Sequence, residues 1–348
     1  MADEHDEHIQ RIIELSRPGG PIAASAPTAT VNNPQWFRFG PGGEREPRGS
    51  RALLHEQLQQ QVRQSRPNVE QERKAVVLAG PPGAGKSTVR KGVLGEDDKK
   101  YLIIDADDFK AALLKQAQQD GSYETSIKPE RVKDLERETG QRFYPMELAS
   151  LVHEESSMLA ADLRRDSIER GDNIVVDTVL SNEQTARDLG ATLHQAGYDV
   201  QVIDVEVPYE VSQERIRGRW LEARQEAEQA SQRSTDNEAE HLGGRWVPSE
   251  YARDVFNGPG GKTKSEHAAH VLAETCPAVS RYRVYRSTTE QAQQNARPTR
   301  ETDKSRLPAG EQNLVDTSQV QTLNRLRTTR TAARRHTPRG PSQGRGRE

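Results

Sequence analysis

The chain has 348 residues, of which 32% are hydrophobic, 5% aromatic and 30% charged, and its formal net charge is −3. Such a composition predicts one folded core with polar extensions, and the charge argues against strong attraction of the whole molecule to nucleic acid or an anionic membrane. The single cysteine, Cys276, excludes an internal disulfide. The acidic first residues lack a signal-peptide core, and no apolar run reaches the roughly 18 residues that span a bilayer. We therefore expect a cytoplasmic protein with no membrane segment.

Residues 1–49 are predicted to form an N-terminal extension. Ile9, Ile12 and Ile13 recur at helical spacing, which indicates a short amphipathic helix. Residues 18–34 are rich in Gly, Pro, Ala, Ser and Thr, a composition typical of a flexible linker. Apolar positions between residues 50 and 64 predict a second helix, which we expect to pack on the core just before the first strand.

The predicted folded domain covers residues 50–286, where strand-like apolar runs alternate with helical patterns. The expected strands are residues 75–79, 101–105, 173–177, 200–207 and 282–286. Repeated strand–helix units predict a three-layer α/β fold, with a mostly parallel central sheet between two layers of helices. The charged segment 120–140 is expected to be irregular, and a long helix is expected over residues 145–170.

Residues 287–348 are predicted to form a disordered tail, because they contain very few apolar side chains. The end of this tail is rich in arginine: Arg325, Arg327, Arg330, Arg334, Arg335, Arg339, Arg345 and Arg347. These side chains could make weak electrostatic contacts with nucleic acid. A solvated tail without such a role is the simpler interpretation.

The segment from Gly80 to Ser87 matches the phosphate-loop pattern G-x-x-x-x-G-K-[ST] between a predicted strand and a predicted helix. Its glycines let backbone N–H groups turn towards phosphate oxygens, and the start of the helix adds the positive end of its dipole. Lys86 would reach the β- and γ-phosphates, and the Ser87 hydroxyl would ligate Mg²⁺. The sequence therefore predicts a nucleoside triphosphate site formed by Gly80, Pro81, Pro82, Gly83, Ala84, Gly85, Lys86, Ser87 and Thr88.

Three aspartates, Asp105, Asp107 and Asp177, lie at or just beyond the carboxyl ends of predicted strands, the edge at which open α/β sheets bind their ligands. Phosphoryl transfer to a hydroxyl needs a carboxylate within reach of that hydroxyl. Asp107 suits this role, although Asp107 or Asp108 could instead only cap the following helix. Asp105 has a second interpretation as an acid that holds Mg²⁺ through water.

Arginines that could face a transferring phosphate come later in the chain. Arg215 and Arg219 are spaced to share one helix face, whereas Arg217 points elsewhere. Arg245 lies in a loop before a helix, where an arginine can move with a lid. An arginine over the γ-phosphate stabilises charge in the transition state, but solvation at the surface is the alternative for each of these side chains.

Together these motifs resemble the zeta toxins, which are P-loop kinases of toxin–antitoxin systems. The best-known members phosphorylate UDP-N-acetylglucosamine on a sugar hydroxyl with ATP. The resemblance covers roughly residues 50–286 and rests on several motifs in the same order. It implies that Asp107 is the catalytic base, that Asp177 binds the sugar, and that Lys86, Arg219 and Arg245 act on the transferred phosphate.

The acceptor side of the site is less well specified by the resemblance. Residues 153–157 resemble the start of the substrate-side helix, which implies roles for Glu154, Ser156 and Ser157, with a polar helix face as the alternative. Asp177 is followed by Thr178, but the turn Thr178-Val179-Leu180-Ser181 has no arginine where the family pattern has one. This departure leaves the acceptor open. The resemblance favours a UDP-sugar, and a nucleotide, an antibiotic or a polynucleotide 5′-hydroxyl are alternatives. A nucleotide-regulated binding protein is the alternative of another class.

The resemblance also implies a regulatory partner. Zeta toxins are held inactive by separate antitoxin helices that block the ATP site. An antitoxin protein could bind this chain in the same way. Alternatively, the predicted helix within residues 7–15 could act in cis.

Overall fold

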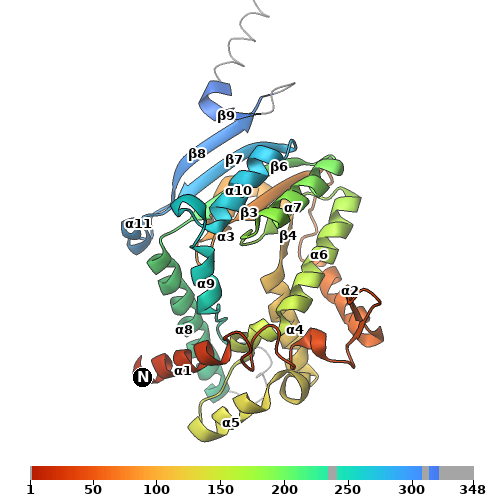
Figure 1. Ribbon diagram of the computed structural model, residues 1–348, viewed down its shortest axis with the longest axis vertical. Helices are drawn as coiled ribbons and strands as arrows, with labels where there is room; N and C mark the ends of the chain where they lie inside the picture. Colours follow the sequence, from red (N-terminus) through yellow and green to blue (C-terminus); the bar gives the residue numbers. More distant parts are fainter. Residues whose placement is uncertain (1, 234–240, 308–312, 321–348) are drawn as a thin grey trace, which may run out of the picture.

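A seven-stranded sheet with the strand order β4-β5-β3-β6-β7-β8-β9 forms the centre of the part of the chain that this computed structural model describes, residues 2–233, 241–307 and 313–320 (Figure 1). Neighbouring strands from β4 to β7 are parallel, and β8 and β9 add antiparallel pairings. The expected α/β fold with a mostly parallel sheet is confirmed. The strands are β3 (Lys74–Ala79), β4 (Leu102–Asp105), β5 (Ile174–Asp177), β6 (Asp199–Glu206), β7 (Val279–Arg286), β8 (Thr299–Arg306) and β9 (Leu314–Asp316).

Both faces of the central strand β3 are buried. Ala75 and Val77 belong to the larger apolar cluster, which includes side chains of α6, α7 and α10. Val76 and Leu78 point the other way, into a cluster with side chains of α3. Because every side chain from Ala75 to Ala79 is buried, the strand reads as one continuous apolar run in the sequence. The helices of the two layers are α3 (Lys86–Leu94), α6 (His153–Arg170), α7 (Glu183–Gln195) and α10 (Lys264–Thr275).

The sheet continues beyond residue 286, where we expected the folded domain to end. Strand β8 contains no apolar residue, yet it pairs along its length with β7. Ion pairs join the two strands, from Arg281 to Asp303 and from Arg286 to Glu301, each at 2.8 Å. An added strand gains its hydrogen bonds from the backbone, so composition alone could not predict it. The eight arginines from Arg325 to Arg347 lie outside the described residues.

The N-terminal helix α1 (Ala2–Leu15) lies against the rest of the molecule, beside α8 (Tyr209–Arg233) (Figure 1). Its Ile9, Ile12 and Leu15 are buried in the larger apolar cluster. The following segment, which we expected to be a flexible linker, instead forms successive turns in which Ile22 is fully buried. Small alanine side chains allow these turns to pack closely. The segment is therefore packed, although its composition is typical of a flexible linker.

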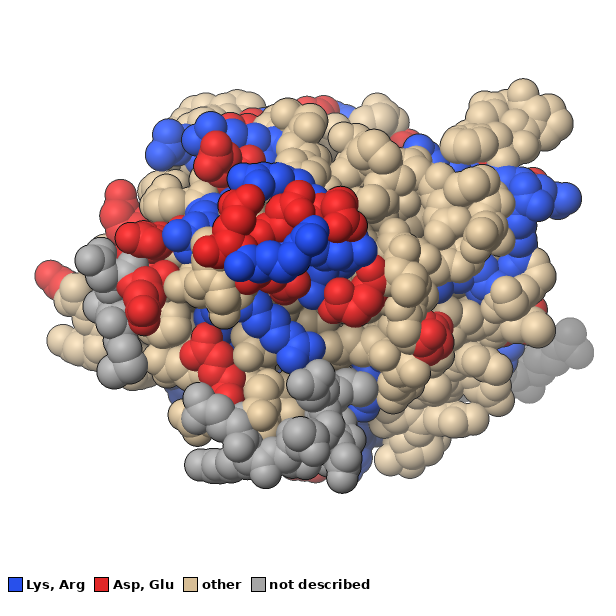
Figure 2. Space-filling view, turned by 90° about the horizontal axis from the view of Figure 1, so that it is seen from below, with Lys and Arg blue, Asp and Glu red and all other residues tan. Residues whose placement is uncertain are grey.

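The segment 120–140, which was expected to be irregular, contains a π-helical turn (Tyr123–Ile127) and the helix α5 (Glu130–Thr139). Viewed from the side on which α5 lies, the surface carries a patch of closely interleaved positive and negative side chains (Figure 2). Ion pairs within α5, such as Arg137 to Glu130 at 3.0 Å, account for part of this mixing. Neither sign of charge dominates this patch.

The remaining elements frame the site. The long helix expected from residue 145 is divided into a 3₁₀ segment (Pro145–Val152), with non-helical backbone angles at Leu148, and α6. Among the described residues no helix combines the length and the apolar character needed to cross a bilayer. The other elements are β1 (Phe37–Phe39), β2 (Arg45–Pro47), α2 (Gly49–Gln64), α4 (Ala106–Gln119), α9 (Ser249–Val255) and α11 (Thr289–Gln293).

Candidate active site

One large cavity of about 1020 Å³ lies beyond the carboxyl ends of β3, β4 and β5. The phosphate loop forms one part of its wall, and residues from several distant segments of the chain form the rest. Sequence-predicted site residues in its lining are Pro81, Pro82, Gly83, Ala84, Gly85, Lys86, Ser87, Asp105, Asp107, Glu154, Ser157, Asp177, Thr178, Arg219 and Arg245. The fold therefore brings most of the predicted site together in a single place.

The phosphate loop has backbone angles that only glycine adopts easily. Gly80 has a φ of 138°, and a Cβ atom there would lie 2.2 Å from the carbonyl oxygen of Val205. Gly83 has a φ of 75°, and its Cβ would lie 2.8 Å from the carbonyl oxygen of Ser212. The helix α3 begins at Lys86, whose Nζ donates to the carbonyl oxygen of Gly80 at 3.1 Å. Thr88 lies in the first turn of this helix and is exposed.

Helix α8 supports the loop from behind. Ser212 Oγ donates to the carbonyl oxygen of Pro82 at 2.7 Å, and Arg215 Nη1 donates to that of Gly83 at 3.1 Å. Arg215 was not assigned to the site from the sequence, although its spacing from Arg219 places both on one helix face. Arg219 reaches the cavity itself, whereas Arg217 points away and pairs with Asp6 of α1. As expected, Arg215 and Arg219 lie on the side of α8 that faces the phosphate loop and the cavity, and Arg217 lies on another side.

Asp105 and Asp177 lie side by side at the ends of β4 and β5, where they are partners in the strand register. Burial, followed by the neighbouring Asp177 carboxylate, raises the pKa of Asp105 to about 6. Burial also raises the pKa of Asp177, while Lys86, with its Nζ 3.7 Å from Asp177 Oδ1, opposes that shift. Asp105, Asp177 and Ser87 line the same cavity, and carboxylate and hydroxyl oxygens are ligands that fit Mg²⁺.

The cap of α4 is Asp105, because its Oδ1 accepts the backbone N–H of Asp107 at 2.9 Å. The alternative that Asp107 or Asp108 caps this helix is therefore wrong. The carboxylate of Asp107 instead faces the cavity, where it pairs with Lys110 at 3.0 Å and with Arg245.

Lys110 is a buried residue in the wall of the cavity, and no role was predicted for it from the sequence. Its side chain is 6% exposed, and burial lowers the pKa of its ammonium group to about 8, against the attraction of Asp105. The signal that could have identified it is its position one helical turn after Asp107, which places both side chains on one face of α4. Lys110 can hold the carboxylate of Asp107 in a fixed orientation.

On the substrate-side helix, Glu154 and Ser157 line the cavity, but the prediction for Ser156 is wrong. Ser156 is fully buried, and its Oγ donates to the carbonyl oxygen of His153 at 2.8 Å. Positions three apart on a helix share a face, so a helix that presents Glu154 and Ser157 turns Ser156 inward. Its neighbour Glu155 is buried as well.

A sequence model of a protein family, described as Zeta toxin, matches residues 58–317. The chain belongs to the zeta toxin family. Membership implies a phosphotransferase of the kinase type. The match extends beyond β9, so the antiparallel strands at the edge of the sheet fall within it. No curated protein matches the chain.

This zeta toxin is also similar to solved structures of low sequence identity. The AvrRxo1-ORF1:ORF2 complex with ATP is 17% identical, with 76% of this chain and 69% of that chain covered and a TM-score of 0.44. The same complex with sulphate ions is 16% identical, with 82% and 74% covered and a TM-score of 0.46. The PezAT toxin–antitoxin system of Streptococcus pneumoniae gives 14% identity, coverage of 72% and 81%, and a TM-score of 0.41.

The turn after Asp177 forms part of the cavity wall in this zeta toxin. Leu180 has a φ of 50°, and its backbone N–H donates to Thr178 Oγ1 at 3.1 Å. A positive φ is unusual for a residue other than glycine and costs about 1–3 kcal/mol, and such conformations concentrate at ligand sites. Thr178 therefore holds the turn in a conformation that presents apolar side chains to the cavity.

The N-terminal extension completes the wall of the cavity. Ile13, Arg17 and Arg45 all line it. The buried Nε of Arg45 has no hydrogen-bond partner among the described residues, although its Nη2 donates to Asn32 at 3.0 Å. From the sequence, this extension was expected to reach the site only through the helix within residues 7–15, as an inhibitor in cis, and the two arginines had no predicted role. The N-terminal extension of this zeta toxin thus adds two arginines, Arg17 and Arg45, to the wall of the cavity, whereas the turn that follows Asp177 has no arginine.

Proposed function

We propose that this zeta toxin uses ATP and Mg²⁺ to phosphorylate a hydroxyl group of UDP-N-acetylglucosamine or a related UDP-sugar. The observation that carries the proposal is that the phosphate loop and Asp107 line the same cavity. Its volume of about 1020 Å³ is at the upper end of the range for small-ligand sites, which leaves room for a nucleotide and an acceptor together. A direct transfer between two bound substrates requires such an arrangement.

The donor half of the proposed site is the loop from Gly80 to Ser87 with the start of α3. Backbone N–H groups and Lys86 bind the phosphates, so Lys86 gives up its bond to the carbonyl oxygen of Gly80 when ATP binds. Ser87 and Asp105 would hold Mg²⁺, which neutralises charge on the phosphate oxygens when it is bound. Arg215 keeps the loop in position through its bond to Gly83.

The acceptor half centres on Asp107. In the proposed reaction Asp107 accepts the proton of the acceptor hydroxyl as the oxygen of that hydroxyl bonds to the γ-phosphorus and the bond to the β,γ-bridging oxygen breaks. Arg245 now pairs with Asp107, and the negative γ-phosphoryl group attracts it away from that carboxylate. Arg245 and Arg219 then stabilise charge on the transferring group, and Asp107 becomes available to the hydroxyl.

The cavity also offers partners for a diphosphate sugar. Asp177, Thr178, Glu154 and Ser157 supply hydrogen-bonding groups for sugar hydroxyls. Arg17 and Arg45 supply positive charge for the diphosphate, a role that the turn after Asp177 cannot perform. This combination of polar groups and cations favours a UDP-sugar over an uncharged acceptor.

The proposed activity is tested with labelled ATP, Mg²⁺ and a panel of UDP-sugars, nucleosides, antibiotics and 5′-hydroxyl oligonucleotides. We expect label on a UDP-sugar, with transfer lowered on the order of 10²–10⁴-fold by Asp107→Asn. The matched control is Asp108→Asn, since Asp108 is the next residue and lies outside the lining of the cavity. Label on another acceptor alone would overturn the UDP-sugar, and nucleotide binding without any transfer would support a nucleotide-regulated binding protein.

We also propose that any antitoxin of this protein is a separate chain. The alternative, inhibition in cis by α1, requires a helix that can leave the site. However, Ile9 and Ile12 of α1 are buried in the main core, and His8 forms a buried hydrogen bond with Glu147 at 3.1 Å. A helix held in this way is a permanent part of the fold. Removal of residues 1–45 tests the point, because a folded and more active product would establish inhibition in cis.

A further inference from the structure

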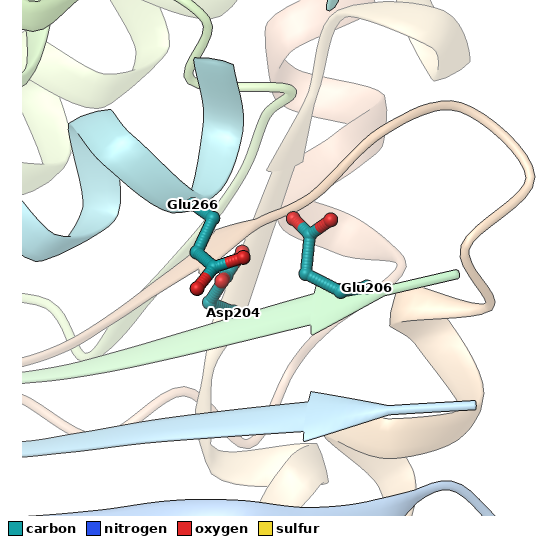
Figure 3. Close-up of side chains that lie close together, drawn as sticks. All are labelled: Asp204, Glu206 and Glu266. Carbon is teal, nitrogen blue, oxygen red and sulfur yellow. The ribbon is translucent and has the colours of Figure 1, made fainter. Parts of the chain in front are cut away.

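A second group of acids lies away from the nucleotide cavity. Asp204 and Glu206 point to the same side of β6, and Glu266 reaches towards them from the first turn of α10 (Figure 3). One carboxylate oxygen from each residue lies within 4.8 Å of the others. Asp204 and Glu206 are fully buried and Glu266 is 6% exposed. None of the three lines the large cavity.

While both strand acids are ionised, the carboxylate of Asp204 has no hydrogen-bond donor among the described residues, and only a shared proton could join it to Glu206. Neither of its oxygens, nor Oε2 of Glu206, has a hydrogen-bond donor among the described residues. A buried polar atom without a partner costs free energy, and a buried charge without one costs considerably more. The carboxyl groups of the three acids lie close together at the end of β6 beside α10 (Figure 3).

The positive and hydroxyl groups nearby are already used by the other two acids. Lys262 contacts Glu266 Oε1 at 3.0 Å, and Arg286 contacts Glu266 Oε2 at 2.9 Å. Thr263 donates its hydroxyl to Glu206 Oε1 at 2.8 Å. Three carboxylates therefore face two cations, and both cations contact the same carboxylate. Burial raises the pKa of both Asp204 and Glu206, the direction expected for acids that lack a positive partner.

We propose that Asp204, Glu206 and Glu266 form a second divalent-cation site, separate from the nucleotide cavity. The ligands are all carboxylate oxygens, which select Mg²⁺, Mn²⁺ or Ca²⁺ over metals that prefer nitrogen or sulfur. Two oxygens bound to one such cation lie at most about 4–5 Å apart, given metal–oxygen distances of about 2.0–2.6 Å. The three acids meet this limit, because one oxygen of each lies within 4.8 Å of the others. A bound cation gives the unpaired oxygens of Asp204 and Glu206 their partner.

The position of this site gives it a structural role in the kinase fold. It joins β6 to α10, and Arg286 connects it to β7. Val205, between the two acids of β6, carries the carbonyl oxygen that packs against Gly80 of the phosphate loop. Helix α8, which supports the same loop, begins shortly after Glu206. A cation here fixes the end of the strand against which the phosphate loop is built.

The test is thermal unfolding of the full chain without nucleotide, after treatment with EDTA and then with added MnCl₂, MgCl₂ or CaCl₂. We expect at least one of the cations to raise the Tm by roughly 2–5 °C, and electron paramagnetic resonance to detect one tightly bound Mn²⁺. Asp204→Asn combined with Glu206→Gln should abolish both effects. Glu274→Gln, which alters an exposed acid on the same helix, should preserve both.

A further variant separates this site from the nucleotide site. Ser87→Ala removes the proposed ligand for the catalytic metal, and the rise in Tm should persist in it. A rise that disappears in Ser87→Ala would assign the cation to the nucleotide cavity and overturn the proposal. An unchanged Tm together with no bound Mn²⁺ in the wild-type chain would also overturn it, because Asp204 and Glu206 would then share a proton in place of a metal. The wild-type measurement decides even if the double variant does not fold.

Discussion

Arg245 and Asp107, which are 138 positions apart, form an ion pair in the cavity. Lys110 occupies the other oxygen of the same carboxylate at 3.0 Å. The side chain proposed to accept the proton of the acceptor hydroxyl thus lies between two cations. A competing negative group can release Arg245, whereas the buried Lys110 stays in place. In the proposed mechanism, phosphate binding would therefore be coupled to exposure of the base.

Arg245→Ala is expected to lower kcat on the order of 10³-fold, because the transferring phosphoryl group loses the arginine that stabilises its charge. The binding of ATP should change much less, since the loop from Gly80 to Ser87 remains intact. The matched control is Arg253→Ala, which removes an exposed arginine on the nearby helix α9. Steady-state transfer from labelled ATP measures both variants. Equal kcat values for the wild-type chain and Arg245→Ala would show that this side chain does not act on the phosphoryl group.

Gly80→Ala and Gly92→Ala should have opposite effects. The new Cβ at Gly80 would lie 2.2 Å from a backbone carbonyl oxygen, so the phosphate loop must shift and ATP binding should be lost. At Gly92 a Cβ meets nothing within 4 Å, and alanine in the middle of α3 should add about 0.5–1 kcal/mol to the free energy of unfolding. Calorimetric ATP titration and urea unfolding measure the two effects. Undiminished ATP affinity in Gly80→Ala would contradict the geometry of the loop.

Stability should fall in acid through Glu155. Burial alone would raise the pKa of this carboxyl, but hydrogen bonds from His55 and from Arg51 outweigh burial and lower the pKa from 4.5 to about 2. The ionised form is therefore favoured in the folded state, and its contribution is complete above about pH 4.5 and is lost as the pH falls towards 2. The difference in pKa corresponds to roughly 3 kcal/mol.

The measurement for Glu155 is urea unfolding of the wild-type chain and of Glu155→Gln at several pH values. The difference in unfolding free energy between them should shrink as the pH decreases from 4.5 to 2. Glu154→Gln is the control, because Glu154 is exposed and precedes Glu155 in the same helix turn. A difference that stays constant with pH would contradict the role assigned to the buried carboxylate.

Ile12→Ala should reduce the free energy of unfolding by about 2–5 kcal/mol, because Ile12 of α1 is fully buried in the main core. Ile13→Ala, one position further along the same helix, should cost less, since that side chain is only half-buried. Denaturant unfolding compares the two variants. If both lose the same small amount, α1 is not part of the cooperative core.

The sequence was sufficient to predict the fold class and the succession of strand, loop and helix around the phosphate-loop pattern. Residues 80–87 and the apolar run before them form a local pattern, and a local pattern determines the strand, the loop and the start of the helix. Asp105 and Asp177 could also be placed, because parallel strands bring their carboxyl ends to one edge of the sheet. In the structure they are direct partners in the strand register, which the rule alone does not determine.

Contacts between distant segments could not be predicted in the same way. Strand β8 depends on backbone pairing with β7 and on ion pairs such as Arg281 with Asp303, and it has no apolar pattern to detect. Residues 18–34 have the composition of a linker, and only the packing of side chains such as Ile22 distinguishes them from one. Ser156 was misassigned because the sequence does not define which side of α6 faces the cavity.

The buried contacts of His8 constrain the order in which the molecule can assemble during synthesis. His8 emerges early from the ribosome, but Glu147 and Arg224, which it contacts at 3.1 and 2.7 Å, are made 139 and 216 residues later. Helix α1 must therefore wait, with Ile9 and Ile12 uncovered, until most of the chain has been translated. Because the same extension lines the cavity, the wall of that cavity is incomplete on a nascent chain until this late docking occurs.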